Sequence, residues 1–367
     1  MMKKLVILFA VFTLVGSFAL SAVAADWSFY GSARMKTFHE IDDKITTQTD
    51  PDDGDTTWDL QGNARLGATV KNGDIGGGFE YGSTPNLRKL YGTYTFGNNE
   101  LLVGQTYTPV SNYFYANQVW GDDNDLLGLG QAYAGRLPMI QLTFNKMVKV
   151  ALVRPSSTIT IAGTDFDADG TVETSENPDT DVIIPKLEVS FNMSKEKFFV
   201  DAFMGAQTFS VENIGTTGGD NVDVTSYVVG AGGGVTLGKA YVNAGLSYAL
   251  NGGNYGLVST GSNNRGTYNS TSIDVNDNTT LSGLLVAGLK PNETVTVEVG
   301  VGYDSQDLDV AGAEKDDTMC YYVNTTYNIT KGVFVVPEVG YFDYMDSNTG
   351  ADQGSMLYFG AKTQINF

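Results

Sequence analysis

The chain has only one cysteine, Cys320, and only one histidine, His39. A single cysteine excludes an intramolecular disulfide, and these two residues are too few for a zinc site built from Cys and His. A Ser–His–acid site could be assembled around His39, but no nucleophile motif accompanies it. We therefore interpret His39 as an ordinary histidine at the outer end of the first strand, and the sequence predicts that the protein is not an enzyme.

Basic residues are also scarce. The chain has 22 Lys and Arg against 42 Asp and Glu, a formal net charge of −20 at pH 7. Such an acidic chain lacks the cationic surface that releases counterions from DNA or RNA, so nucleic acid is excluded as a partner.

Long apolar runs are absent except at the N-terminus. There, "MMKK" is followed by the apolar run "LVILFAVFTLVGSFAL" and by the small-residue stretch "SAVAAD". This pattern predicts a secretory signal peptide over residues 1–25, which leaves 26–367 as the mature domain; an uncleaved N-terminal anchor is the alternative. No later stretch of 18 or more residues is apolar, which excludes a helical membrane protein.

What the chain does contain is alternation with a period of two residues. In "WDLQGNARLGATVKNGD", Trp58, Leu60 and Leu66 fall on one face of a strand, whereas Asp59 and Arg65 fall on the other. "TVTVEVGVGYD", "KAYVNAGLSYAL" and "MLYFGAKTQINF" repeat the pattern. These segments are longer than the usual strand of a soluble domain and match the roughly 9–11 tilted residues that cross a bilayer.

Sixteen such segments can be counted, with short turns such as "FGNNE", "LGKA" and "ITKGV" alternating with long polar loops. Both ends of the mature chain are strands, so the first can pair with the last and leave no sheet edge. We expect an all-β transmembrane antiparallel barrel of about 16 strands; a soluble all-β secreted protein is the alternative. The predicted strands are 26–38, 57–70, 75–84, 87–96, 100–108, 136–145, 146–155, 182–193, 197–210, 223–237, 240–250, 279–289, 294–304, 317–329, 332–344 and 355–367.

The last strand, "LYFGAKTQINF", alternates apolar residues and ends on Phe367. It resembles the assembly signal of Gram-negative outer-membrane proteins. In architecture the whole mature chain resembles the general porins, a superfamily of sixteen-stranded trimeric barrels. "LRKLYGTYTFGNNELLVGQTYTP" followed by "GRLPMIQLTF" is similar to the region around the porin constriction loop. The resemblance implies a homotrimer in the outer membrane of a Gram-negative bacterium, in contact with lipid, lipopolysaccharide and the assembly machinery.

The resemblance also implies that the long loop after the fifth strand, residues 110–135, folds into the barrel and narrows it. The alternative is an external loop that lies over the mouth. In porins, acidic residues of this loop face a basic wall, and the field between them orients polar solutes. The constriction residues expected here are Asp122, Asp123 and Asp125 on the loop and, by strand parity, Arg34, Lys36, Arg65 and Lys89 on the wall. Charges that merely face lumen water are the other interpretation.

Ion preference is predicted from where the remaining acids fall. Lumen acids are expected to balance the basic wall roughly, which places the negative excess in the loops and predicts weak cation preference. The expected lumen acids are Asp59, Glu188, Asp201, Glu298 and Glu338.

One loop carries a calcium-type sequence. "DFDADGTVETSE", residues 165–176, has the spacing of an EF-hand loop without the flanking helices, and it lies in the external loop 156–181. Gly170 permits the sharp turn that such a loop needs. The sequence predicts a possible Ca²⁺ site, an acidic solvated loop being the alternative, and no other cofactor. The predicted ligands are Asp165, Asp167, Asp169, Thr171, Glu173 and Glu176.

The predicted function is an outer-membrane porin that lets small hydrophilic solutes and ions diffuse passively. Two other functions stay open. The first is a plugged barrel that serves as an adhesin or structural surface protein. The second is a channel selective for one substrate.

Overall fold

The computed structural model describes residues 25–43, 54–84, 86–111, 115–156, 179–214, 220–269, 272 and 274–367. Residues 1–24 of the predicted signal peptide and the predicted calcium ligands lie outside the described residues. Within the described part, no helix is long and apolar enough to cross a bilayer.

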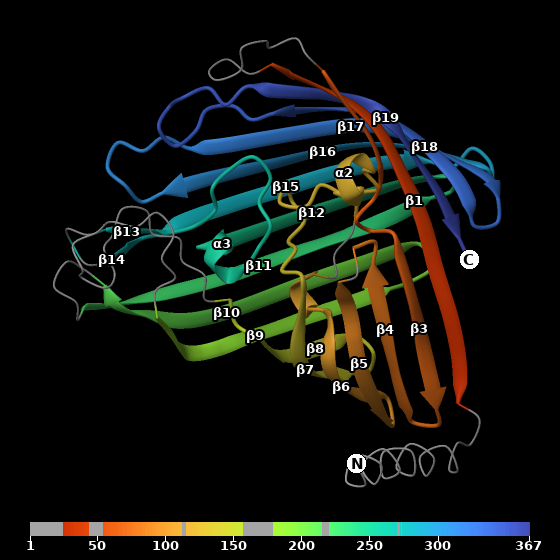
Figure 1. Cartoon of the computed structure of the whole chain (residues 1–367), viewed down its shortest axis with the longest axis horizontal. Coiled ribbons are helices and arrows are strands. Elements are labelled where there is room, and N and C mark those ends of the chain that lie inside the picture. The colour runs from red at the N-terminus through yellow and green to blue at the C-terminus, as the bar shows by residue number, and fades with distance from the viewer. Residues whose placement is uncertain are drawn as a thin grey trace, which may run out of the picture.

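The strands form one closed antiparallel barrel (Figure 1). The first strand pairs with the last, from Ser32 opposite Asn366 to Asp43 opposite Ser355. Two consecutive strands, β2 and β3, both pair with β1, so they are two parts of one interrupted strand, and sixteen strands surround the lumen. This confirms the predicted fold. The barrel strands are β1 (Asp26–Asp43), β2 (Asp55–Leu60), β3 (Arg65–Asn72), β4 (Ile75–Gly82), β5 (Leu87–Phe96), β6 (Asn99–Tyr107), β7 (Arg136–Phe144), β8 (Val148–Val153), β9 (Thr180–Ser194), β10 (Phe198–Ile214), β11 (Asp220–Leu237), β12 (Ala240–Leu250), β15 (Asn278–Leu289), β16 (Val295–Leu308), β17 (Asp316–Thr330), β18 (Val333–Asp343) and β19 (Ser355–Asn366).

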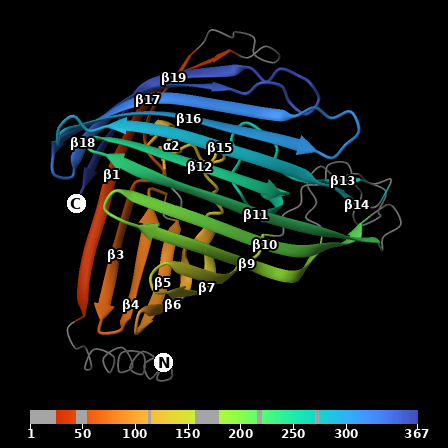
Figure 2. The same ribbon diagram turned by 180° about the vertical axis from the view of Figure 1, so that it is seen from behind.

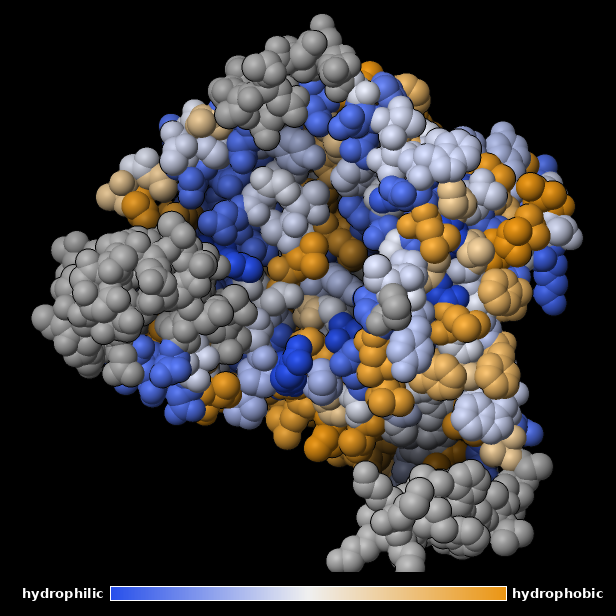
Figure 3. Space-filling model, in the orientation of Figure 1, coloured by the Kyte–Doolittle hydropathy of each residue, from blue (hydrophilic) through white to orange (hydrophobic). Residues whose placement is uncertain are grey.

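The two faces of each strand differ in chemistry, as the alternation predicted. On β19, Leu357, Phe359 and Ile365 are exposed on the outside, whereas Tyr358 and Lys362 are buried inside. Figure 3 shows apolar side chains gathered along the lower edge of the molecule. In hydrocarbon every peptide group needs a partner within the sheet, and closure supplies one for each strand.

Exposed aromatic side chains mark both ends of the wall. One set lies at the end with the short turns and the other toward the long loops, the arrangement of the two aromatic girdles of a membrane barrel. The first set includes Trp27, Phe96, Phe144 and Phe367, and the second includes Trp58, Tyr81, Tyr227 and Tyr248.

The wall is not of even height. The strands from β3 to β8 have between 6 and 10 residues, whereas β9, β10 and β11 have 15, 17 and 18. Figures 1 and 2 show the short strands together on one side of the barrel and the long strands on the other.

The last residue lies against the first strand. The Phe367 backbone exchanges two hydrogen bonds with Gly31 on β1, with N···O distances of 2.8 and 3.1 Å. A Cβ at Gly31 would collide with the Phe367 ring, so the glycine makes room for the terminal aromatic. Its role as an assembly signal stays a prediction.

Four short elements complete the fold. They lie inside or above the barrel and not in its wall. They are the 3-10 helix η1 (Pro109–Ser111), the helices α2 (Trp120–Asp123) and α3 (Gly252–Tyr255), and the hairpin of β13 (Thr267–Asn269) with β14 (Asp274–Asn276).

Candidate pore constriction

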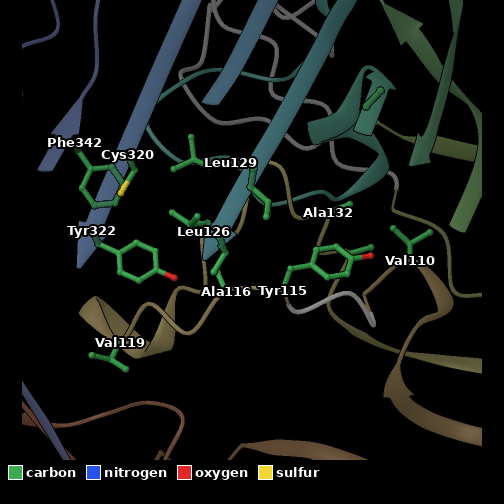
Figure 4. Packing of buried hydrophobic residues seen from close by; sticks show 14 of the residues in the cluster. Val110, Tyr115, Ala116, Val119, Leu126, Leu129, Ala132, Cys320, Tyr322 and Phe342 are labelled. Carbon is green, nitrogen blue, oxygen red and sulfur yellow. The ribbon is translucent and has the colours of Figure 1, made fainter. Parts of the chain in front are cut away.

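The segment between β6 and β7 lies inside the barrel, as the resemblance implied, and not over its mouth. We call residues 108–111 and 115–135 the inner loop. Its apolar side chains pack against an apolar patch on the lumen side of the long strands (Figure 4). Gly232 provides the space for the Tyr115 ring, because a Cβ there would overlap it. The loop side chains in this core include Val110, Tyr115, Ala116, Val119, Leu126 and Leu129, and the wall side chains include Cys320, Tyr322, Phe342 and Tyr358.

Three wall glutamates hold the inner loop by its backbone. Glu338 accepts hydrogen bonds from the amides of Val119 and Trp120, both at 2.8 Å. Glu298 accepts from the Asn117 amide at 2.7 Å, and Glu188 accepts from the Val110 amide at 3.0 Å. Charge-assisted bonds of this kind are stronger than neutral ones, so the carboxylates fix the loop on the wall.

These glutamates therefore do not line the passage. Glu188, Glu298 and Glu338 are 0, 2 and 4% exposed, because the loop covers them. The tyrosine hydroxyls of Tyr255, Tyr322 and Tyr358 donate to the same carboxylates. The expectation that these three acids balance the basic wall as lumen charges is wrong, since a sequence does not show which lumen residues a loop will cover.

The second strand is interrupted where the loop contacts it. The prediction of one continuous strand over 57–70 is wrong, because residues 61–64 leave the ladder between β2 and β3. The Gln61 side chain donates to the carbonyls of Val119 and Gly121, at 3.2 and 3.1 Å, and the Gly62 amide donates to Asp122 Oδ1 at 2.7 Å. The interruption frees polar groups that then bind the tip of the loop.

Two of the three predicted loop acids meet basic residues. Asp123 contacts Arg34 Nη1 at 2.5 Å and Lys362 Nζ at 2.9 Å. Asp122 lies 3.8 Å from Lys36 Nζ. These contacts connect the loop tip to the wall where β1 and β19 close the barrel.

The third acid, Asp125, has no ion pair among the described residues. Burial, followed by the charge of Asp123, raises its pKa well above the usual range for an aspartate. The backbone of this tip is strained, because Asp123, Asp125 and Leu126 all have positive φ, between 54° and 61°. Such conformations persist only where surrounding contacts hold them.

The basic wall is organised around Glu80 on β4. Its carboxylate contacts Arg88 Nε at 2.8 Å, Lys89 Nζ at 3.2 Å and Arg65 Nη1 at 3.9 Å. Tyr30 adds a hydrogen bond from its hydroxyl at 3.0 Å. Glu80 is 1% exposed, so its carboxylate is covered by the cluster and does not contact lumen water directly.

A β-bulge explains how two consecutive basic residues reach the same carboxylate. Glu80 pairs with Lys89 and Tyr81 pairs with Leu87, so Arg88 is an extra residue on β5. Tyr107 extends the cluster: the cationic groups of Lys89 and Arg136 each lie 5.2 Å from its ring centroid.

The structure thus brings together the predicted basic wall residues and adds others. Arg34 and Lys36 contact the acids of the inner loop, and Arg65 and Lys89 contact Glu80. Lys362 could have been found by parity on the last strand, and Glu80 by parity on "GGGFEYG". Arg88 could not, because strict alternation points it away from the lumen and only the bulge reverses it. The residues that the sequence analysis missed are Glu80, Arg88, Arg136 and Lys362.

A second segment also folds into the lumen. Residues 251–266, which include α3, contact the inner loop through the Val258 amide to the Tyr133 carbonyl at 3.0 Å and Thr260 Oγ1 to the Leu127 carbonyl at 2.8 Å. Figure 1 shows this segment and the inner loop on the side of the long strands. Together they occupy part of that side of the lumen, where a cavity of about 390 Å³ remains between Asn117, Lys239 and Lys290.

A larger open space lies on the side of the short strands. A cavity of about 850 Å³ faces the short turns there. Its lining residues are mainly polar, and it reaches the basic cluster at Tyr107. The lining includes Ser28, Thr69, Thr93, Thr95, Gln141, Thr143 and Lys149.

The described residues contain no group of three or more His, Cys, Asp or Glu arranged to hold a metal ion. The six predicted calcium ligands are not among those residues, so the calcium loop stays a prediction.

Comparisons with known proteins identify the fold. No protein-family model matches the chain, and no curated protein sequence matches it. Among solved structures, the outer membrane channel DcaP of Acinetobacter baumannii superposes with a TM-score of 0.71 at 17% identity, over 95% of this chain and 99% of that one. OmpT of Vibrio cholerae in its trimer form gives 0.58 at 15% identity, over 94% of this chain and 100% of that one. An anion-selective porin from Comamonas acidovorans gives 0.58 at 12% identity, also over 94% and 100%. The chain therefore has the closed sixteen-stranded barrel fold of outer-membrane porins.

Proposed function

We propose that the protein is a channel of the Gram-negative outer membrane through which small hydrophilic solutes and ions diffuse. The observation that carries this proposal is the division of the lumen. The two inner segments pack against the long strands, and a cavity of about 850 Å³ with mainly polar lining residues lies along the short ones. Passage needs no covalent step and no energy input, since size and charge alone filter the solutes. The protein has no catalytic role in this proposal.

Conductance across a planar bilayer is the direct test. The refolded mature chain should give discrete open-channel steps. A plugged barrel that acts as an adhesin would give none. Conductance that saturates with one particular solute would favour a substrate-selective channel, which the narrow passage beside the inner loop also supports.

The proposed ion preference departs from the weak cation preference that the acidic composition predicts. Glu80, Glu188, Glu298 and Glu338 are almost fully buried, as are Arg88 and Lys362. Among the partly exposed charges, four basic side chains face three acids: Arg34, Lys36, Arg65 and Lys89 against Asp122, Asp123 and Asp125. The narrowest section sets the electrostatic barrier, so we expect anions to pass more readily than cations. The anion-selective porin from Comamonas acidovorans shares the fold, which supports this choice.

Replacing Arg88 and Lys89 together by glutamine should shift the preference toward cations. The double variant removes two positive charges and leaves Glu80 poorly compensated, so the anion-to-cation permeability ratio should fall severalfold. The measurement is the reversal potential under a salt gradient. Lys331→Gln, in the turn between β17 and β18, removes an exposed charge far from the passage and should leave the potential unchanged.

The ion preference should also depend on pH. Because the pKa of Asp125 is raised, this group is neutral up to a higher pH than an ordinary aspartate. As the pH falls through that raised pKa, the passage loses a negative charge and anion preference should increase. Asp125→Asn should remove this part of the pH dependence. A pH dependence that the variant retains in full would contradict the assignment.

The proposed assembly is a homotrimer in contact with outer-membrane lipid and lipopolysaccharide. The trimer form of OmpT from Vibrio cholerae, which shares the fold, supports it. Cross-linking of the detergent-solubilised protein tests the state directly.

Calcium binding by residues 165–176 is a further part of the proposal. Chelation of calcium should lower the thermal stability of the wild-type protein, and Asp167→Ala and Glu176→Ala should lose both calcium uptake and this effect. Asp52→Ala, in the acidic stretch "TDPDDGD" of residues 49–55, is the matched control. Wild-type calcium uptake by both ligand variants would exclude the site.

A further inference from the structure

We infer that the inner wall of β15 and β16 holds a binding site for a small monovalent cation of about the size of sodium. The site lies away from the constriction, under residues 257–266, which we call the capping segment. Its central group is Asp304.

Four polar side chains form a square on this wall. Ser282 and Asp304 are direct cross-strand partners, and so are Thr280 and Gln306 in the next inward-facing row. All four are at least nine-tenths buried, with exposures of 6, 1, 8 and 1%. Side chains of directly paired residues lie about 4.5–5.5 Å apart at Cβ, so the square can surround a single small ion.

The carboxylate of Asp304 is buried without a basic partner. It accepts hydrogen bonds from Ser282, from Ser262 at 3.0 Å and from Gln306 Nε2 at 2.7 Å. No described Lys or Arg forms an ion pair with it. Hydroxyl and amide donors solvate the carboxylate but leave its charge uncompensated. Buried charges are normally paired or bound to a metal ion, so we expect a bound cation beside this carboxylate.

Two oxygens beside this charge have no hydrogen-bond partner in the structure: Gln306 Oε1 and Thr280 Oγ1. The contact with Asp304 sets the orientation of the Gln306 amide, because the carboxylate Oδ2 at 2.7 Å can only accept and so faces the amide nitrogen and not the oxygen. Its oxygen is therefore a true acceptor with nothing to accept from. A buried polar atom without a partner indicates a bound water or ion.

The capping segment closes the square and leaves a small cavity. A cavity of about 20 Å³ lies here. Its polar lining includes Asp304, Gln306, Thr280, Ser282, Ser259 and Gln131, and its other lining residues include Gly128, Ala132, Ala249, Leu257 and Val258. This volume holds one water-sized particle. Carboxylate, amide and hydroxyl oxygens are hard ligands, and a single carboxylate on the cavity balances one positive charge.

An ion at this point would connect three parts of the lumen. It would bind the wall through Asp304 and Gln306 and the capping segment through its serines, next to the inner loop at Gly128. The capping segment already bonds to the inner loop through Thr260 and Leu127, so the ion would stabilise both segments that narrow the channel.

The site can be tested by thermal unfolding of the detergent-solubilised full chain. The measurement compares sodium chloride with choline chloride at equal ionic strength. The wild-type midpoint should be several degrees higher in sodium. Asp304→Asn should abolish the difference and Thr280→Val should reduce it, since valine keeps the shape and removes one ligand oxygen. Asp307→Asn, an exposed acid on the same strand, should retain the full difference.

Crystals soaked with thallium(I), which replaces small monovalent cations and scatters anomalously, locate the ion. A peak inside the square that is missing in Asp304→Asn supports the proposal. Equal midpoints in both salts and no peak would mean that the cavity holds a water molecule, which overturns it. A parallel unfolding measurement in calcium chloride uses Glu176→Ala, so that calcium bound by the external loop does not contribute to the stability. Stabilisation by calcium but not by sodium would overturn the monovalent assignment.

Discussion

Deleting residues 112–133 and joining Ser111 to Ala134 through two glycines should raise single-channel conductance severalfold. The ends can be joined because the Ala134 amide already donates to Ser111 Oγ at 2.7 Å. The deletion removes the inner loop and leaves the sixteen-stranded wall intact. The cross-section that limits the current then becomes that of the barrel.

The same deletion should weaken the ion preference. Without the loop, Glu298 and Glu338 lose the amides of Asn117, Val119 and Trp120 and face lumen water. Acids and bases then both line a wide passage, in which salt screens them. Adding Glu298→Gln and Glu338→Gln to the deletion should restore anion preference at high conductance. A deletion variant with unchanged conductance would show that the inner loop is not the constriction.

The wall was predictable from the sequence because the strands of a membrane barrel show a local alternation of apolar and polar residues. Each strand must show lipid one face and the lumen the other, so period-two patterns of about ten residues suffice to count and place strands. The predicted segment 240–250 coincides with β12, and 87–96 with β5. The interrupted second strand is an exception with a cause, since residues 61–64 bind the loop tip and not a neighbouring strand.

The inside of the barrel was predictable only in part. Parity placed Arg34, Lys36, Arg65 and Lys89 toward the lumen, and the resemblance placed the acidic loop among them. Which lumen residues the loop covers depends on its packing over long sequence distances, such as Glu338 to Val119. The inward fold of residues 251–266 likewise depends on tertiary contacts, and composition alone does not distinguish it from an external polar loop.

Burial therefore affects the acidic and the basic residues of the barrel wall differently. The acids of the long-strand wall accept hydrogen bonds from the inner loop, whereas Arg65 and Lys89 of the short-strand wall stay partly exposed. The net charge of the chain is thus a poor guide to the charge that a permeating ion meets.

Glu80→Gln should be among the most destabilising single changes in the barrel wall. Glu80 and Arg88 are 1 and 4% exposed at their side chains, and Lys89 and Arg65 lie against the same carboxylate. Removing one partner of a buried ion pair leaves the other charges uncompensated, which costs about 3 kcal/mol in the free energy of unfolding. The measurement is urea unfolding of the protein in lipid vesicles.

Asp307→Asn is the control, because it breaks an ion pair with Lys315 in which both side chains are more than half exposed. We expect this variant to stay within about 0.5 kcal/mol of the wild type. Channel recordings of Glu80→Gln give a second, independent result: the cluster gains net positive charge, so anion preference should increase while conductance changes little. A stability equal to that of the control, with an unchanged reversal potential, would mean that Glu80 does not organise the basic wall. The positions of Arg88 and Lys89 would then depend on the β5 bulge alone.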